Sequence, residues 1–235
     1  FERVKGLFSY GWKLLLSALL DVGYNNLHSL VIGKIFTPAT LGFYSRGNQF
    51  PSFIVSNINA SIQSVMFPAL SKEQDDLIRV KSMTRRAIVT SSFIILPLMA
   101  WLAAIAEPLV LIVLGEKWLP CVPFLQIYCV IYAFWPIHTS NLSAIKAVGR
   151  SDLFLKLEIT KKILGLGILL YTVYFFHSPI AIALGGAIAG ILSTFINAHP
   201  NKKILSYGYL EQMKDILPSF VVAIIMGLGL WWLTR

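Results

Sequence analysis

Long uncharged runs alternate along this chain with short polar segments that are rich in basic residues. Five stretches contain no Lys, Arg, Asp or Glu: 47–71, 87–106, 118–145, 163–201 and 216–234. Each is longer than the ~18 residues that a membrane-spanning helix needs, and the fourth is long enough for two helices. The pattern predicts an all-α, polytopic transmembrane helix bundle.

Polar breaks divide the chain into about seven predicted spans. A tight turn is expected at 37–40, and a short surface helix at 71–86 after the second span. Pro136 is expected to kink the fourth span, and a GxxxG motif at Gly186 and Gly190 would permit close helix packing in the sixth. The predicted spans are 8–36, 41–69, 87–106, 119–145, 154–176, 179–200 and 216–233.

Composition supports a membrane protein. Hydrophobic residues make up 56% of the chain and charged residues 13%, whereas a soluble domain carries about 25% charged residues. The net charge of +9 is concentrated on one side, because 16 of the 20 Lys and Arg lie near the N-terminus or in 71–86, 146–162 and 201–214. The positive-inside rule places these segments, and the N-terminus, in the cytoplasm. Topology and contact with anionic membrane lipids explain this charge, so no nucleic-acid partner is predicted.

Both ends of the chain suggest a fragment. The sequence begins at Phe1 without Met or a signal peptide, and seven spans would leave Arg235 outside, directly after Trp231 and Trp232. We therefore expect truncation at both ends. Cys121 and Cys129 lie about 12 Å apart along one predicted helix, too far for a disulfide, and are expected to be inert packing residues.

The first two predicted spans differ from the others because charges lie inside them. Asp21, Lys34 and Arg46 interrupt otherwise apolar sequence. A charge at bilayer depth costs roughly 2.5–3.5 kcal/mol on insertion scales, so it normally faces water or protein. These two spans are therefore predicted to form the working face of a transporter.

Polar residues in both spans follow helical spacing. Ser17, Asp21, Asn25 and His28 share one face of the first span, and Ser52, Ser56, Asn59 and Gln63 share one face of the second, with Arg46 and Asn57 beside them. The short turn between the spans would let both faces line one cavity. The alternative is that these groups only hydrogen-bond neighbouring helices.

Each charged group has a functional and a structural interpretation. Arg46 could bind phosphate oxygens, since a guanidinium matches them bidentately. Asp21 could couple transport to an ion gradient, or could pair with Arg46 or Lys34 to hold the bundle, and Lys34 could simply reach the interface. His28 could sense protons or bond to a backbone carbonyl. The polar inner end of span four, from His138 to Ser143, could line the same cavity or serve structural hydrogen bonds.

Motifs for catalysis are absent from the sequence. It contains no HExxH, GxSxG or Walker A motif and no Cys/His metal spacing. We therefore predict no enzymatic activity, no metal and no cofactor. Three other classes stay open: a drug or cation exporter, a membrane-embedded enzyme of envelope assembly, and a structural membrane subunit.

The sequence resembles a known family through motifs spread over nearly the whole chain. The first are Asp21 with Leu27-x-x-Leu30-Val31-Ile32-Gly33-Lys34, Leu41-Gly42-x-Tyr44-x-Arg46-Gly47-x-x-x-Pro51, Asn57-Ile58 and Phe67-Pro68-x-x-Ser71. Glu116-Lys117-Trp118-Leu119-Pro120, Trp135-Pro136-Ile137-His138, Gly149-Arg150-Ser151-Asp152 and Phe195-Ile196-Asn197-Ala198-x-Pro200-Asn201 follow. Together they resemble the bacterial polysaccharide flippases of the lipopolysaccharide-biosynthesis type, which belong to the superfamily of multidrug and toxin extruders.

The resemblance implies a two-lobed transporter of which this chain is the C-terminal half. Residues 1–200 would form a six-helix lobe and 201–235 a cytoplasmic loop and one additional helix, with the N-terminal lobe as a missing partner. The implied activity is flipping of undecaprenyl-pyrophosphate-linked oligosaccharide across the bacterial inner membrane by alternating access, driven by an ion gradient. Arg46, Asn25, His28, Asn57, Asn59 and Gln63 are the candidate substrate-binding residues, and Asp21 is the candidate coupling residue.

Overall fold

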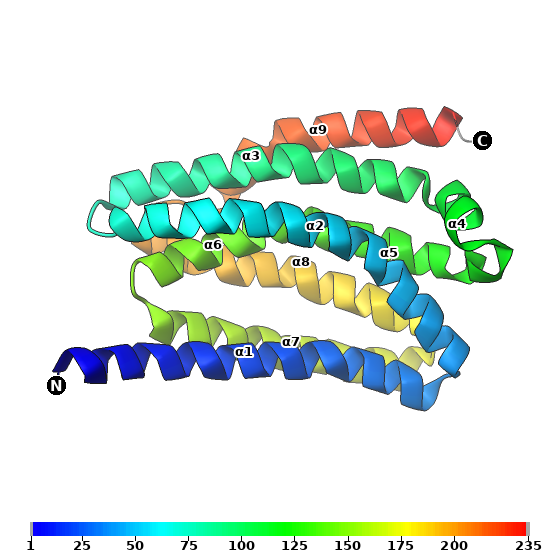
Figure 1. Ribbon diagram of the computed structural model, residues 1–235, viewed down its shortest axis with the longest axis horizontal. Coiled ribbons are helices and arrows are strands. Elements are labelled where there is room, and N and C mark those ends of the chain that lie inside the picture. Colours follow the sequence, from blue (N-terminus) through cyan, green and yellow to red (C-terminus); the bar gives the residue numbers. More distant parts are fainter. Residues whose placement is uncertain (1, 234–235) are drawn as a thin grey trace.

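The computed structural model describes the backbone of residues 2–233 and the side chains of 11–24, 26–230 and 232. Among these residues it contains helices and no strand, which confirms the all-α prediction. The elements are α1 (Glu2–Ile35), α2 (Pro38–Lys72), α3 (Leu77–Ala104), α4 (Ala106–Leu114), the 3₁₀ turn η1 (Glu116–Cys121), α5 (Val122–Ala133), α6 (Trp135–Ala147), α7 (Ser151–Phe176), α8 (Pro179–Ile204) and α9 (Tyr209–Leu233) (Figure 1).

Capping residues set two helix boundaries that the sequence placed elsewhere. Thr37 caps α2 by accepting a hydrogen bond from the Thr40 backbone N–H at 3.2 Å, and Pro38 already occupies the first helical turn. The turn is therefore shorter than the predicted 37–40. Asp76 caps α3 through the N–H groups of Ile78 and Arg79. The prediction of a separate surface helix at 71–86 was wrong. With this cap, α3 begins at Leu77, ten residues before the start of the predicted span 87–106.

The fourth predicted span is divided into two helices. α5 ends at Ala133, and α6 begins at Trp135 with Pro136 in its first turn. Since proline lacks the N–H that a continuous helix would need, it favours a new helix start. The prediction that Pro136 disturbs this span is confirmed.

Five segments of the described chain are long and apolar enough to cross a membrane: α2, α3, the segment 116–147 that contains η1, α5 and α6, α8 and α9. α1 and α7 are outside this set, and both carry several charged residues. A multi-pass helical membrane protein is thus supported, whereas the number of seven spans stays a prediction.

The helices pack as a layered bundle (Figure 1). α1 lies along α7, α7 lies along α8, and α8 contacts α5 and α6 in the middle. α2 and α3 pack on the other side of α5 and α6, and α9 lies outermost against α3. α1 meets α2 over a shorter stretch than it meets α7, so the two helices diverge after their turn. The proposed boundary between 1–200 and 201–235 stays a prediction.

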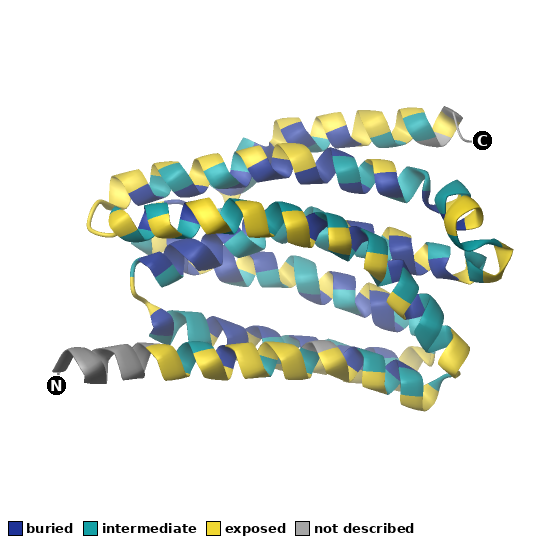
Figure 2. Ribbon diagram, viewed as in Figure 1, coloured by how far each residue is buried: buried dark blue, intermediate teal, exposed yellow. Residues whose placement is uncertain are grey.

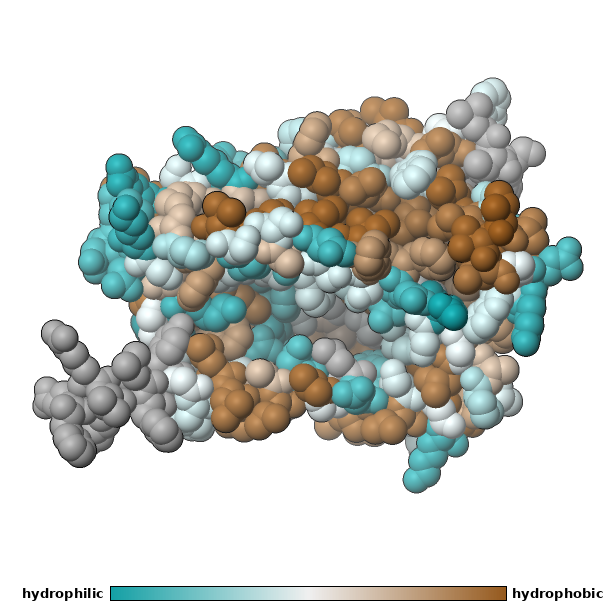
Figure 3. Space-filling view, viewed as in Figure 1, coloured by the Kyte–Doolittle hydropathy of each residue, from teal (hydrophilic) through white to brown (hydrophobic). Residues whose placement is uncertain are grey.

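Buried residues concentrate on the inward faces of α3, α5, α6 and α8, while outer helix faces are exposed (Figure 2). Large apolar side chains dominate several of these outer faces, and brown patches mark them in Figure 3. Such an apolar exterior is what a lipid environment requires. Cys121 and Cys129 are buried and free, in agreement with their predicted packing role.

Close helix approach occurs at three glycines outside the predicted GxxxG motif. A Cβ on Gly47 would lie 2.5 Å from the Cβ of Phe124, one on Gly165 2.0 Å from the Tyr24 hydroxyl oxygen, and one on Gly185 2.8 Å from Thr172 Cγ2. A Cβ on Gly186 would meet nothing within 4 Å, and one on Gly190 only ordinary contact. The packing role predicted for the GxxxG motif was therefore wrong, because Gly186 faces open space.

Candidate functional site

A cavity of about 440 Å³ lies between α1, α2, α5, α6, α7 and α8. The wall from α1 and α7 is charged, the wall from α2, α5 and α6 is aromatic, and α8 contributes small residues. In Figure 3 the surface between α1 and α2 is hollowed and largely hydrophilic.

Two ion pairs form the charged wall. Lys162 Nζ lies 2.5 Å from Asp21 Oδ1 and joins α7 to α1. Lys161 Nζ lies 2.5 Å from Glu158 Oε1, and both of these side chains are at most 7% exposed. Lys162 also lies 4.0 Å from the second oxygen of Glu158, so all four charges form one network. Burial of the Glu158–Lys161 pair would be costly if either charge lacked its partner, whereas Asp21 is exposed at the edge of the network.

Asp21 therefore lies in the cavity, as predicted, but its partner is neither Arg46 nor Lys34. The positive-inside rule assigned Lys161 and Lys162 to the cytoplasmic segment 146–162, and Glu158 was not among the predicted site residues. The network was therefore not predicted. The signal was present, because Glu158, Lys161 and Lys162 follow at the i, i+3 and i+4 positions of one helix face inside the predicted span 154–176.

His28 also lines the cavity. Its Nδ1 lies 3.5 Å from the Tyr24 carbonyl oxygen one turn earlier, and its ring meets the edge of the Tyr24 ring at 5.0 Å. The helical spacing of Asp21 and His28 thus places both in one site, as the sequence predicted. The side chain of Asn25 lies outside the described residues.

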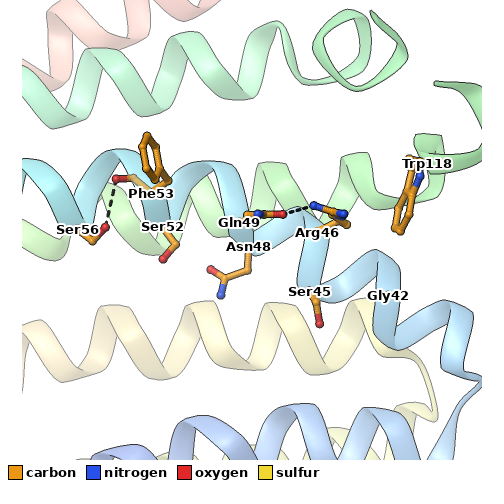
Figure 4. A pocket seen from close by; sticks show the side chains of 9 residues that line it. All are labelled: Gly42, Ser45, Arg46, Asn48, Gln49, Ser52, Phe53, Ser56 and Trp118. Atoms are coloured by element: carbon orange, nitrogen blue, oxygen red, sulfur yellow. Dashed lines mark hydrogen bonds between the residues drawn. The ribbon is translucent and has the colours of Figure 1, made fainter. Parts of the chain in front are cut away.

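Arg46 lies in a neighbouring open groove of about 660 Å³ on α2 (Figure 4). It donates a hydrogen bond to Gln49 Oε1 at 2.5 Å, and its guanidinium lies 5.3 Å from the ring centre of Trp118. Ser45 and Asn48 line both the groove and the cavity, so the two sites are adjacent. The groove adds a half-buried cation beside the charged cavity.

Of the other predicted residues of α2, Ser52 and Ser56 line the groove, whereas the remaining three lie apart from both sites. Asn57 donates to the Phe53 carbonyl oxygen at 2.7 Å and is exposed. Gln63 accepts from the Ser143 hydroxyl at 2.5 Å, which joins α2 to α6. Asn57, Asn59 and Gln63 do not belong to the lining of the cavity or the groove. The single shared cavity expected for both polar faces is thus replaced by two adjacent sites, because α2 diverges from α1.

The polar inner end of the fourth span divides between the two predicted roles. His138 lines the cavity, and its Nδ1 lies 2.7 Å from Asn197 Nδ2 of α8. Asn141 instead belongs to a fully buried cluster, in which it accepts from Asn201 at 2.6 Å and exchanges hydrogen bonds with Gln212 of α9. The cluster joins α6, α8 and α9, which is the structural role.

The cytoplasmic end predicted for α9 is further held by charges. Arg85 pairs with Asp215 at 2.5 Å, and the Tyr207 hydroxyl donates to the same carboxylate at 2.8 Å. Burial, and then this hydrogen bond, raise the pKa of Tyr207, so its phenol stays protonated and keeps donating. Among the described residues there is no group of three or more His, Cys, Asp or Glu that could hold a metal ion.

Comparison with known proteins gives the family. Residues 1–123 of the 235 match the family model described as "Polysaccharide biosynthesis protein". An "Uncharacterized membrane protein in cps region" of Klebsiella pneumoniae is 27% identical over 94% of this chain and 43% of its own length. The teichuronic acid biosynthesis protein TuaB of Bacillus subtilis is 25% identical over 96% of this chain and 46% of its own.

The lipopolysaccharide biosynthesis protein WzxC of Escherichia coli is 26% identical over 94% of this chain and 42% of its own length. The chain thus spans less than half the length of these curated relatives. No solved structure matches it. The family model covers more than half of the chain and agrees with the resemblance drawn from the sequence motifs. This multi-pass membrane protein therefore belongs to the family of polysaccharide biosynthesis proteins.

Proposed function

We propose that this chain is part of a membrane transporter that flips undecaprenyl-pyrophosphate-linked oligosaccharide from the inner to the outer leaflet of the bacterial inner membrane. The observation that carries the proposal is a charged cavity inside a helical membrane bundle of this family. Relatives named for lipopolysaccharide and teichuronic acid biosynthesis support a polysaccharide substrate. The protein acts without enzymatic chemistry.

The cavity offers what a lipid-linked diphosphate needs. Lys162 is 17% exposed and lines the cavity, where its ammonium could exchange the Asp21 carboxylate for a phosphate oxygen. Arg46, in the adjacent groove, adds a guanidinium suited to bidentate phosphate binding. Since binding a dianion requires unmatched positive charge, release of Lys162 from Asp21 would be the step that prepares the site.

The rest of the transporter is a second lobe contributed by the part of the protein outside this chain. Two lobes rocking about a central site are a common transporter solution, and the α1–α2 side of the cavity would face the second lobe. We place the N-terminus of α1 in the cytoplasm by the distribution of basic residues. Residues 1–200 would form the lobe and α9 the additional helix.

Arg46→Ala in the full-length protein should abolish surface polysaccharide in cells that lack their own flippase. The variant removes the guanidinium beside the cavity, and with it the group whose geometry suits bidentate phosphate binding. Surface glycan is measured by staining, and protein level by membrane immunoblot. Arg150→Ala is the matched control, because Arg150 is exposed and pairs only locally with Asp152. Normal export by Arg46→Ala would contradict the role of the groove.

Asp21→Asn should weaken the dependence of flipping on a proton or sodium gradient by about fivefold or more, which corresponds to a coupling of at least ~1 kcal/mol. The amide keeps the size of the carboxylate but cannot ionise, so Lys162 loses its closer charged partner and keeps only Glu158 at 4.0 Å. Flipping is measured in proteoliposomes with imposed gradients, and Asp75→Asn in the α2–α3 turn serves as the exposed control. An unchanged gradient dependence would leave Asp21 with a purely structural role.

A further inference from the structure

A line of five rings follows the cavity wall that α2, α5 and α6 provide. The helices of the charged wall, α1 and α7, lie on the opposite side of α8 from α2 and α5 (Figure 1). Consecutive ring centroids are 5.5, 6.1, 5.5 and 5.3 Å apart. We call this line the aromatic strip; its members are Tyr44, Tyr128, Tyr132, Trp135 and His138. The charged network and the strip therefore occupy different walls of one cavity.

The strip continues through the break between α5 and α6. Residues 128, 132, 135 and 138 are spaced by four, three and three positions, which keeps them on one face of two consecutive helices. Tyr132 precedes the break and Trp135 follows it, yet their rings remain 5.5 Å apart with a tilt of 54°. The cavity thus has one unbroken row of rings rather than two separate clusters.

Polar partners orient individual rings of the strip. The Tyr132 hydroxyl donates to Asn48 Oδ1 at 3.0 Å, and the His138 ring nitrogen lies 2.7 Å from Asn197 Nδ2. Each ring thereby combines an apolar face with a polar atom at its edge. This combination is typical of aromatic residues at sites that are partly wet and partly apolar.

The part of the cavity lined by α8 leaves space beside the rings. Its lining residues are all small: Ala183, Gly186, Ala189, Gly190, Ser193 and Thr194. An added Cβ at Gly186 would meet nothing within 4 Å. The small side chains of α8 therefore leave this side of the cavity open.

We propose that the aromatic strip binds the saccharide part of the substrate, with sugar rings lying against its ring faces. A pyranose has a face of C–H groups and a rim of hydroxyls, and an aromatic ring has an electron-rich face that attracts the C–H hydrogens. The Tyr, Trp and His edges supply hydrogen-bonding atoms for the rim. This inference rests on the proposed transport function and assigns the diphosphate to the charged wall and the sugars to the strip.

Ring-retaining and ring-removing variants of the full-length protein test the strip. Tyr128→Leu and Trp135→Leu should each weaken saccharide binding about 2- to 10-fold and reduce export, whereas Tyr128→Phe and Trp135→Phe keep a ring and should reduce export less. Tyr174→Leu is the matched control, because Tyr174 is 74% exposed on α7, away from the cavity. Thermal unfolding of every variant separates a loss of binding from a loss of folding.

A direct binding measurement covers the case in which a leucine variant does not fold. Every Trp of the full-length protein except Trp135 is replaced by Phe, and emission is followed during titration with the oligosaccharide released by mild acid from the host's lipid-linked precursor. The saccharide should change Trp135 emission, whereas inorganic pyrophosphate should not. An unchanged emission with saccharide, or full export by both leucine variants, would overturn the role of the strip.

The proposed transport function and the saccharide role of the aromatic strip can be refuted independently of each other. If Arg46→Ala abolishes export while the strip variants export normally, transport stands and the saccharide site is wrong. If the full-length protein restores no surface polysaccharide and confers resistance to toxic cations instead, the proposed function itself is wrong.

Discussion

A Glu158→Gln variant of the full-length protein should unfold at a clearly lower temperature than the unaltered protein. Glu158 and Lys161 pair at 2.5 Å with at most 7% of either side chain exposed. Removing one member of a buried pair leaves the other charge uncompensated, at a cost of about 3–5 kcal/mol. Thermal unfolding in detergent, followed by size-exclusion chromatography with tryptophan fluorescence, measures the effect.

A double replacement shows whether the cost comes from the unpaired charge. Glu158→Leu combined with Lys161→Leu removes both charges and should regain most of the lost stability, because an apolar pair often replaces a buried ion pair at little cost. Asp152→Asn breaks the exposed pair with Arg150 on the same helix and should leave the unfolding temperature nearly unchanged. If Glu158→Gln unfolds like the unaltered protein, the pair is not a determinant of stability.

The double variant also separates stability from transport. A folded double variant that no longer exports polysaccharide would assign the charges of α7 to the substrate path. One that exports normally would restrict Glu158 and Lys161 to a structural role and leave Lys162 as the cavity cation.

A Gly186→Trp variant should lose polysaccharide export while it keeps its fold. The added Cβ meets nothing within 4 Å, so the backbone needs no shift, and the indole would extend into the cavity beside the aromatic strip. Blocking this charged cavity should reduce export to background. Surface glycan and membrane protein level are the two measurements.

Two other glycines give matched comparisons. Gly167→Trp on the exposed side of α7 also meets nothing within 4 Å and should export normally, because it adds bulk away from the cavity. Gly185→Ala should lower stability instead, since its Cβ would lie 2.8 Å from Thr172 Cγ2. Export by Gly186→Trp at the level of Gly167→Trp would show that the substrate does not pass through this cavity.

Features that depend on local sequence were predictable. The uncharged runs predicted helices, and Pro136 predicted a break in the fourth span, which lies between α5 and α6. The spacing of Asp21 and His28 predicted that both share the face of α1 that lines the cavity. Helix ends were less predictable, because a single side-chain cap at Thr37 or Asp76 shifts them. α4 was missed because its apolar sequence was assigned to a connection between spans.

Features that depend on which helices meet were not predictable. The partner of Asp21 lies on α7 rather than on the neighbouring α2, and nothing in α1 indicates this choice. The aromatic strip likewise combines rings from α2, α5 and α6, of which Tyr44, Trp135 and His138 belong to motifs that lie far apart in the sequence. Asn59 and Gln63 share a predicted face of α2 with Ser52 and Ser56, but only the two serines line the groove, and none of the four lines the cavity.

The pairing of α1 with α7 also sets an order of events during biosynthesis. Asp21 and Lys162 are 141 residues apart in sequence. At about 5–20 residues per second, a ribosome needs roughly 7–28 s to add the chain between them. During this interval α1 is already made and must reside in or beside the insertion machinery without Lys162, so completion of the charged wall is a late step in assembly of the protein.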